Sequence, residues 1–163
     1  MPNMDVWRAC DAVETAVCWK AALERNDGPS SLLFSRQGLA PQKRNKKQLA
    51  NIEKGGYVLV DCDNPQALII ATGSEVELAV EAQAKLAEKN INVRVVSMPS
   101  TDVFDRQTQS YRESVLPATV IARVVIEAGV SGGWYKYDGS RSAMICLDTF
   151  GESGPADQVF EHF

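Results

Sequence analysis

From Tyr57 onward, short apolar runs alternate with amphipathic stretches, and this alternation restricts the fold more than any other feature. Strands are predicted at 57–60, 68–71, 93–96, 120–126 and 143–147. Helices are predicted at 74–89, 105–115 and 134–137, with a helical beginning at 156–163. Strands that alternate with helices are typical of an α/β domain, in which a mostly parallel sheet is flanked by helices in three layers.

A partial α/β segment precedes this domain. A helix is predicted to begin at Asp11, whose spacing to Glu14 matches a capping box, and a strand is predicted at 31–34. The helix carries an apolar stripe at helical spacing, formed by Ala12, Ala16, Trp19 and Leu23. One helix and one strand cannot bury their apolar faces alone. We therefore expect residues 1–45 to be poorly ordered, or to be held only by a neighbouring chain.

The stretch 41–56 differs in composition from the segments around it. It is basic and polar at Lys43, Arg44, Lys46 and Lys47, and Gly55-Gly56 closes it. This pattern favours a solvated interdomain linker over a site for an anionic partner. The expected organisation is a partial domain at 1–45, a linker at 46–56 and the main domain at 57–163.

Composition excludes several classes of function. The net charge of −4 argues against broad nucleic-acid binding, which needs a basic surface. No apolar run reaches the roughly 20 residues that span a membrane, and the amino terminus lacks the apolar core of a signal peptide. The four cysteines form no CxxC pair, so we expect free thiols and a cytoplasmic protein.

The run from Leu68 to Glu75 is the most site-like turn. A strand, a tight Gly73-Ser74 turn and a helix start place free N–H groups where an anion could bind. However, the motif is neither GxGxxG nor a P-loop, and Glu75 and Glu77 bring negative charge there. Ser74 and Glu77 also have capping-box spacing. Helix capping is the favoured interpretation, and small-anion binding is the alternative.

Arg36 is the strongest single candidate for a binding residue. It follows a short apolar strand, and ligands gather at the carboxyl ends of strands in α/β sheets. Its planar guanidinium suits phosphate, and a surface salt bridge is an equally acceptable role. His162 is the only histidine and has no partner cluster, so we assign it no acid–base or metal role. The residues alone predict no catalytic centre, cofactor site or metal site.

Eight stretches in order along the chain resemble the transketolase family, and the bacterial type most of all. They are Pro2–Met4, Val6–Asp11, Phe34–Gln37, Gly55–Leu59, Ile70–Val76, Arg94–Ser100, Tyr111–Pro117 and Thr149–Ser153. The resemblance implies that residues 1–45 are the end of the family's pyrimidine-binding domain. It also implies that residues 57–163 are its C-terminal domain without the last helix.

The resemblance implies an activity for the parent enzyme. That enzyme transfers a two-carbon ketol unit between sugar phosphates, using thiamine diphosphate and a divalent metal, magnesium or calcium, in a homodimer. The segments that would carry the catalytic groups and the cofactor loop are not in these 163 residues. We therefore expect the chain alone to be non-catalytic, with no bound cofactor, and to support dimerisation.

One functional residue carries over from the family. The arginine of the Ser-Arg-Gln motif helps to bind the phosphate of the substrate, and that position is Arg36 here. Such a contact would anchor the far end of the sugar and orient its reacting carbon. Ala9 departs from the family's usual proline and Gly154 from its frequent alanine.

Three functional hypotheses follow. The chain is a fragment of a transketolase, or a free-standing small-anion-binding or regulatory module that uses Gly73-Ser74, or a dimerisation domain. The partial segment at 1–45 favours the first, because a natural module should not begin with elements cut from another sheet.

Overall fold

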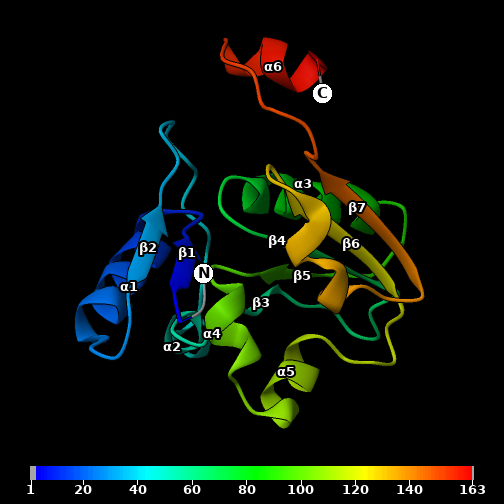
Figure 1. Ribbon diagram of the computed structural model, residues 1–163. Helices are drawn as coiled ribbons and strands as arrows, with labels where there is room; N and C mark the ends of the chain where they lie inside the picture. The colour runs from blue at the N-terminus through cyan, green and yellow to red at the C-terminus, as the bar shows by residue number, and fades with distance from the viewer. Residues whose placement is uncertain (1–2, 163) are drawn as a thin grey trace.

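The computed structural model describes residues 3–162 and places a five-stranded mixed sheet at the centre of the main domain (Figure 1). The strand order is β3-β5-β4-β6-β7. The bounds are β3 Tyr57–Val60, β4 Ala67–Ala71, β5 Val93–Ser97, β6 Ala122–Glu127 and β7 Arg141–Cys146. β4, β5, β6 and β7 pair in parallel, and only the edge strand β3 is antiparallel to its neighbour. The mostly parallel α/β sheet predicted from the alternation is confirmed.

Helices cover both faces of this sheet, because its central strands bury side chains in both directions. Ile69 of β4 packs in a cluster with Val76 and Ala79 of helix α3, Glu75–Ala87. The next residue along, Ile70, packs on the opposite face with Phe104 and Val115. Those two belong to α4, Thr101–Asp105, and α5, Gln109–Val115. The three predicted layers are therefore present, although the helix predicted at 105–115 is two shorter ones.

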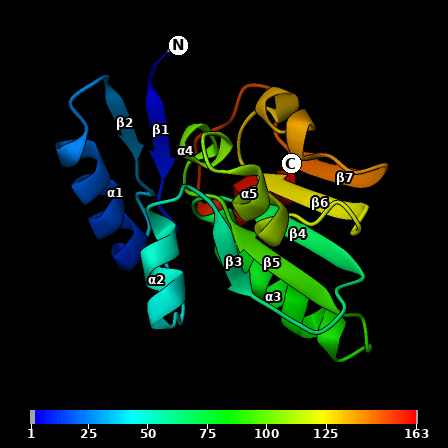
Figure 2. The same ribbon diagram turned by 90° about the horizontal axis from the view of Figure 1, so that it is seen from below.

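The amino-terminal segment forms a second, smaller α/β unit beside the main sheet (Figure 2). It consists of β1, Asp5–Arg8, helix α1, Ala12–Glu24, and β2, Ser30–Leu33. The two strands pair in parallel. The sequence predicted the helix and the second strand but not β1, whose apolar residues Val6 and Trp7 are too few to show a period.

The predicted apolar stripe of α1 does not face the core. Trp19 is 50% exposed and Leu23 is 78% exposed, whereas Glu14 and Cys18 are fully buried. Trp19 instead stacks on Phe34, with ring centroids 6.3 Å apart. The helix thus turns a mixed polar face to the main domain and leaves its apolar face in solvent.

The expectation that residues 1–45 are poorly ordered, or are held only by a neighbouring chain, is wrong for the described part. Trp7 and Cys18 form a buried cluster with Val103 of α4, and Cys10 joins the core cluster under α3. The backbone N–H of Arg8 donates to Pro99 O at 2.8 Å. The small unit is therefore packed against the main domain of its own chain.

The expectation of a solvated linker at 46–56 is wrong for several of its residues. Helix α2, Lys46–Ile52, begins with a capping box made by Asn45 and Gln48. Ile52 is fully buried in the core cluster under α3. Just before this helix, the Arg44 side chain is only 1% exposed. A basic run in the sequence carries no sign of which of its members is buried.

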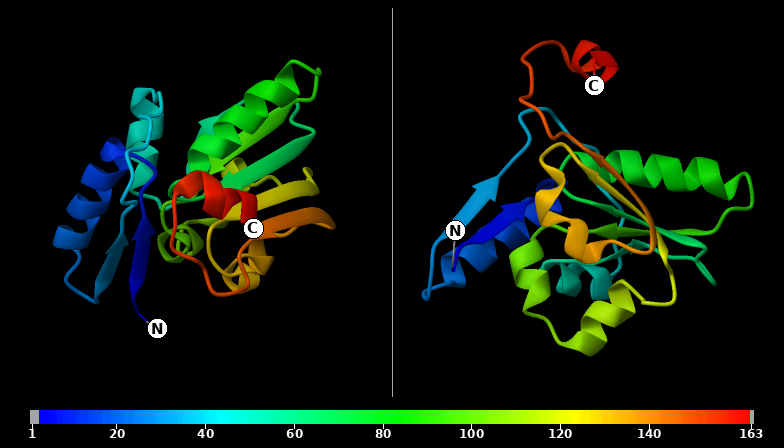
Figure 3. Two further views of the ribbon diagram at one scale, coloured as in Figure 1. Left: turned by 90° about the horizontal axis from the view of Figure 1, so that it is seen from above. Right: turned by 45° about the vertical axis from the view of Figure 1, so that its right-hand side comes forward.

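The carboxyl-terminal part follows the sequence prediction more closely. The short helix predicted at 134–137 is a pair of 3-10 turns, Ser131–Gly133 and Tyr135–Tyr137. Helix α6, Ala156–His162, stands off the body beyond the end of β7 (Figure 3).

Of the two predicted helix caps, only one is formed. Asp11 caps α1 as predicted, by accepting from the N–H of Glu14. The box predicted for Ser74 and Glu77 is absent, because Ser74 is in αR conformation and makes no cap hydrogen bond.

Candidate functional site

The carboxyl ends of β1 and β2 open into a small cavity. Its volume is about 210 Å³, and it lies where the chain leaves both strands and where α1 begins. Ala9, Asp11, Ala12, Thr15, Phe34, Ser35, Gln37 and Leu39 line it. This is the edge at which parallel α/β sheets bind ligands, and the sequence placed Arg36 here.

Arg36 is exposed in the loop that follows β2, between two residues that line this cavity. Within residues 3–162 its guanidinium makes no hydrogen bond or ion pair. The salt bridge considered as its alternative role is therefore not formed inside the described chain. An unpaired guanidinium keeps all five donors for an external acceptor such as phosphate.

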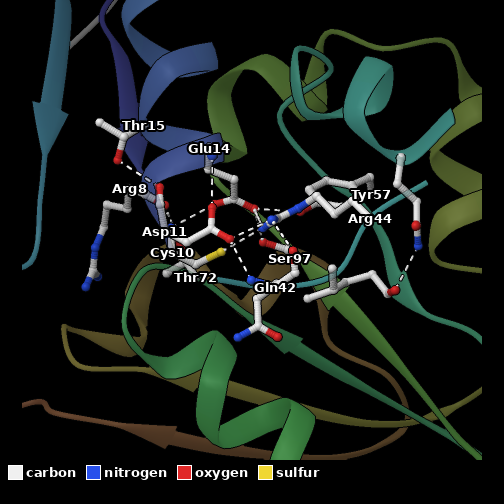
Figure 4. Close-up of polar contacts among 12 residues, drawn as sticks. Arg8, Cys10, Asp11, Glu14, Thr15, Gln42, Arg44, Tyr57, Thr72 and Ser97 are labelled. Carbon is white, nitrogen blue, oxygen red and sulfur yellow. Dashed lines mark hydrogen bonds and ion pairs between the residues drawn. The ribbon is translucent and has the colours of Figure 1, made fainter. Parts of the chain in front are cut away.

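Behind this edge lies a buried polar network that joins the two units (Figure 4). Its centre is Glu14, which has no exposed surface. One of its carboxylate oxygens accepts from Tyr57 Oη at 2.8 Å and from Ser97 Oγ at 2.7 Å. The other accepts from the backbone N–H of Cys10 at 2.8 Å. A buried carboxylate is tolerated because donors from both units surround it.

Arg44 supplies the positive charge of the network. Its Nη1 lies 2.6 Å from Asp11 Oδ2, its Nη2 lies 3.5 Å from Glu14 Oε1, and its Nε donates to Tyr57 Oη at 2.6 Å. Burial by itself would raise the pKa of Asp11. The hydrogen bonds from Arg44 and from the N–H groups of Glu14 and Gln42 outweigh burial and lower that pKa below 3.8. Asp11 is therefore a firmly ionised partner for Arg44.

The network also sets the chemistry of the groups around it. Burial, with Glu14 nearby, raises the pKa of the Tyr57 phenol far above its ordinary value. Burial and the two carboxylates likewise raise the pKa of the Cys10 thiol. Both groups are neutral near pH 7, so neither is a poised base or nucleophile. The arrangement fits a structural joint rather than a catalytic centre.

Sequence reasoning found only part of this network. The spacing of Asp11 and Glu14 revealed a helix start but not that Glu14 is buried. Arg44 was grouped with three lysines in a supposed linker. Tyr57 and Ser97 lie at paired positions on β3 and β5, a relationship that only strand register can give.

The Gly73-Ser74 turn is occupied by the chain itself. Gly73 has φ +57°, and a Cβ there would lie 3.3 Å from Arg8 Nη2. The same guanidinium pairs with Glu75 and Glu127, which are both buried. A turn with two carboxylates and a resident cation gives little support to the small-anion hypothesis.

The remaining candidates are not drawn into a site. His162 is exposed on α6 and lies 3.8 Å from Glu152. Residues 3–162 hold no group of three or more His, Cys, Asp or Glu side chains that could bind a metal ion. No described helix is long and apolar enough to cross a membrane.

The comparisons with known proteins agree on one family. The model of the transketolase-like TK C-terminal domain matches residues 55–163. The chain belongs to this family. It is 60% identical to transketolase 2 of Aliivibrio fischeri and 58% identical to transketolase 1 of Escherichia coli, over 99% of its length in each case. It covers 25% of each of these relatives.

A solved structure of the family supports the fold. The transketolase of Pichia stipitis in complex with sedoheptulose 7-phosphate superposes with a TM-score of 0.90 at 38% identity, covering 99% of this chain and 23% of that one. The chain thus spans about a quarter of the length of its relatives. Within the described residues there is no metal-ligand cluster.

Proposed function

We propose that this chain is the carboxyl-terminal part of a transketolase, which transfers two-carbon ketol units between sugar phosphates with thiamine diphosphate and magnesium or calcium. The observation that carries the proposal is the 60% identity to a bacterial transketolase along the whole chain. The chain by itself is non-catalytic in this proposal. Its contribution is to bind substrate phosphate and to support the assembly.

We assign residues 1–45 to the end of a pyrimidine-binding domain, 46–56 to the connection and 57–163 to the C-terminal domain. The family model begins at residue 55, close to the last of these boundaries. The apolar face of α1, marked by Trp19 and Leu23, is in solvent. A parallel sheet is normally covered on both faces and is rarely as small as the pair β1 and β2. The rest of that domain is the natural cover for this face.

Arg36 is the phosphate-binding residue in this proposal. It lies at the carboxyl edge of β1 and β2 beside a cavity of about 210 Å³, and its guanidinium has no partner among the side chains that the structure describes. A bidentate contact would fix the phosphate end of the sugar. Fixing that end restricts the position of the reacting carbon, so the contact affects substrate binding more than the chemical step.

The parent protein is proposed to be a cytoplasmic homodimer. Large apolar side chains are exposed at the carboxyl end of the main sheet, with Ile145 61% exposed and Phe150 99% exposed. Exposed apolar groups that gather at one end of a domain suit a protein interface. All four cysteines are free thiols, which suits a reducing compartment.

The test is a ketol-transfer assay of the purified full-length protein with thiamine diphosphate and magnesium. We expect Arg36→Gln to raise the KM for a sugar phosphate acceptor about 10-fold or more, as the loss of a charge-assisted contact implies. The KM for an unphosphorylated aldehyde acceptor should not change. Lys43→Gln removes an exposed positive charge further along the chain, outside the cavity lining, and is the matched control.

Two results would count against the proposal. Absence of ketol transfer by the full-length wild type would reject the function. An equal change in KM for phosphorylated and unphosphorylated acceptors would reject the role of Arg36. The 163-residue chain alone should show no transfer.

A further inference from the structure

The carboxyl edge of the main sheet contains the crevice in which open α/β sheets bind ligands. From β4 the chain crosses to β5 on one side, and later returns to β6 on the other side of β4. Such a reversal of direction creates a crevice beyond the strand ends. Thr72 and Gly73 follow β4 at this edge, and Glu127 ends β6.

The side chain of Arg8 lies in this crevice and contacts its acids. Arg8 is the last residue of β1, and Figure 4 shows it directed away from the buried network around Glu14. Its Nη2 lies 3.3 Å from Glu75 Oε2, and its Nη1 contacts Glu127 Oε1. The side chains of the two acids are 6% and 7% exposed. One guanidinium therefore bridges two buried acids from different elements of the main domain.

The surroundings are shaped for this group. Gly73 has no side chain, and a Cβ added at this position would lie only 3.3 Å from Arg8 Nη2. Glycine therefore leaves room for the guanidinium. Ser74 Oγ donates to Glu75 Oε1 at 2.6 Å and so orients the carboxylate whose other oxygen receives Arg8. Arg8 is also fixed through its backbone, whose N–H donates to Pro99 O at 2.8 Å.

We propose that this crevice is a guanidinium-binding site, which the chain fills with its own Arg8 and thereby holds β1 against the main sheet. The two acids lie on separate elements, so a forked planar cation can reach both of them. A lysine ammonium is a point charge and cannot bridge them with the same geometry. Arg8 is thus a positioning residue for the edge of β1 and β2 that carries Arg36, and this last point rests on the proposed function.

Chemical rescue of Arg8→Ala tests the site in the purified protein. Thermal unfolding is measured with methylguanidinium or methylammonium chloride, each at about 10 mM, a concentration far below that of denaturing guanidinium. We expect Arg8→Ala to lower the Tm by roughly 5 °C. Methylguanidinium should restore at least half of this loss, and methylammonium should restore none. Equal effects of the two cations, or an unchanged Tm for Arg8→Ala, would overturn the proposal.

Two further variants keep the test decisive if Arg8→Ala does not fold. Arg8→Lys keeps the charge and should still lower the Tm, because an ammonium cannot bridge both acids. Methylguanidinium should restore little of this loss, because the lysine side chain occupies the crevice. Arg8→Ala combined with Glu75→Gln and Glu127→Gln removes the acids and should show no rescue. If methylguanidinium still raises the Tm of this triple variant, the cation binds elsewhere and the proposed guanidinium site is wrong.

The positioning role has its own readout in the full-length protein. We expect Arg8→Ala to raise the KM for sugar phosphate several-fold with a smaller change in kcat, and methylguanidinium to reverse the KM change. If the wild type has no ketol-transfer activity, the proposed function fails, while rescue of the Tm still decides the guanidinium site. If activity is present but KM is unchanged, the positioning role fails.

Discussion

Arg44 Nη1 lies 2.6 Å from Asp11 Oδ2, and both side chains are 1% exposed. The pair joins the start of α1 to the segment before α2, and it lies against Glu14 and Tyr57. A buried ion pair of this kind contributes little net stability to the folded protein. Removal of one partner is nevertheless strongly destabilising, because it leaves the other charge buried and uncompensated.

Replacement of Arg44 by methionine should therefore be strongly destabilising. The change leaves Asp11 and Glu14 buried without their cation, and we expect a loss of about 3–5 kcal/mol in the free energy of unfolding. Urea unfolding followed by fluorescence measures this loss. Lys43→Met, at an exposed neighbouring position, should change stability by less than about 0.5 kcal/mol.

Tyr57→Phe probes the donor side of the same network. It removes the hydroxyl that donates to Glu14 and accepts from Arg44. Loss of a buried partner of charged groups is expected to cost about 1–3 kcal/mol in urea unfolding. Tyr135→Phe is the control because that side chain is 62% exposed. Similar losses for the two variants would show that the buried hydroxyl has no special role.

Acid should weaken the joint through Asp11. Its folded pKa is lowered below the ordinary 3.8, so the unfolded state binds more protons in this range. The stabilisation from Asp11 is fully present above pH 3.8 and is lost as the pH falls through the folded pKa. Unfolding measured between pH 6 and pH 2 should show a steeper acid loss for the wild type than for Asp11→Asn. Parallel curves would contradict this linkage.

The two buried cysteines, Cys10 and Cys18, should react more slowly with a thiol reagent than Cys62 and Cys146. Burial, with Glu14 nearby, raises the pKa of Cys18 to about 12, and burial also raises that of Cys10. At pH 8 both thiols should resist a thiol-specific disulfide reagent, whereas Cys62 and Cys146, which are only partly buried, should react first. All four should react after unfolding in urea. Four equally fast thiols in the native protein would contradict the buried positions.

Leu23→Ser tests the proposed cover over α1. Leu23 is 78% exposed, so in the 163-residue chain the substitution should shift the Tm by less than about 2 °C. In the full-length protein, where the missing part of the domain is proposed to cover this face, the same change should lower the Tm. If Leu23→Ser changes the Tm negligibly in both the 163-residue chain and the full-length protein, the proposal that the rest of the domain covers this face of α1 is wrong.

The sequence by itself determined the elements that depend on neighbours along the chain. The alternation after Tyr57 gave the parallel sheet and its helices, because the side-chain periods of strands and helices are local properties. The sequence also argued against anion binding at the Gly73-Ser74 turn, because Glu75 and Glu77 lie next to it. The position of Arg36 after a strand and the family motif around it were readable without coordinates.

Tertiary structure alone decided which polar residues are buried and with whom. Glu14 and Arg44 are 30 residues apart, and Arg8 and Glu127 are 119 apart. A charged residue carries no local sign that a distant partner will compensate its burial. The apolar stripe of α1 led to a wrong prediction of which face of the helix is buried. A helical period shows that a helix has an apolar face, but only the tertiary structure shows what that face contacts. The joint between the two units is therefore a property of the fold rather than of any one segment.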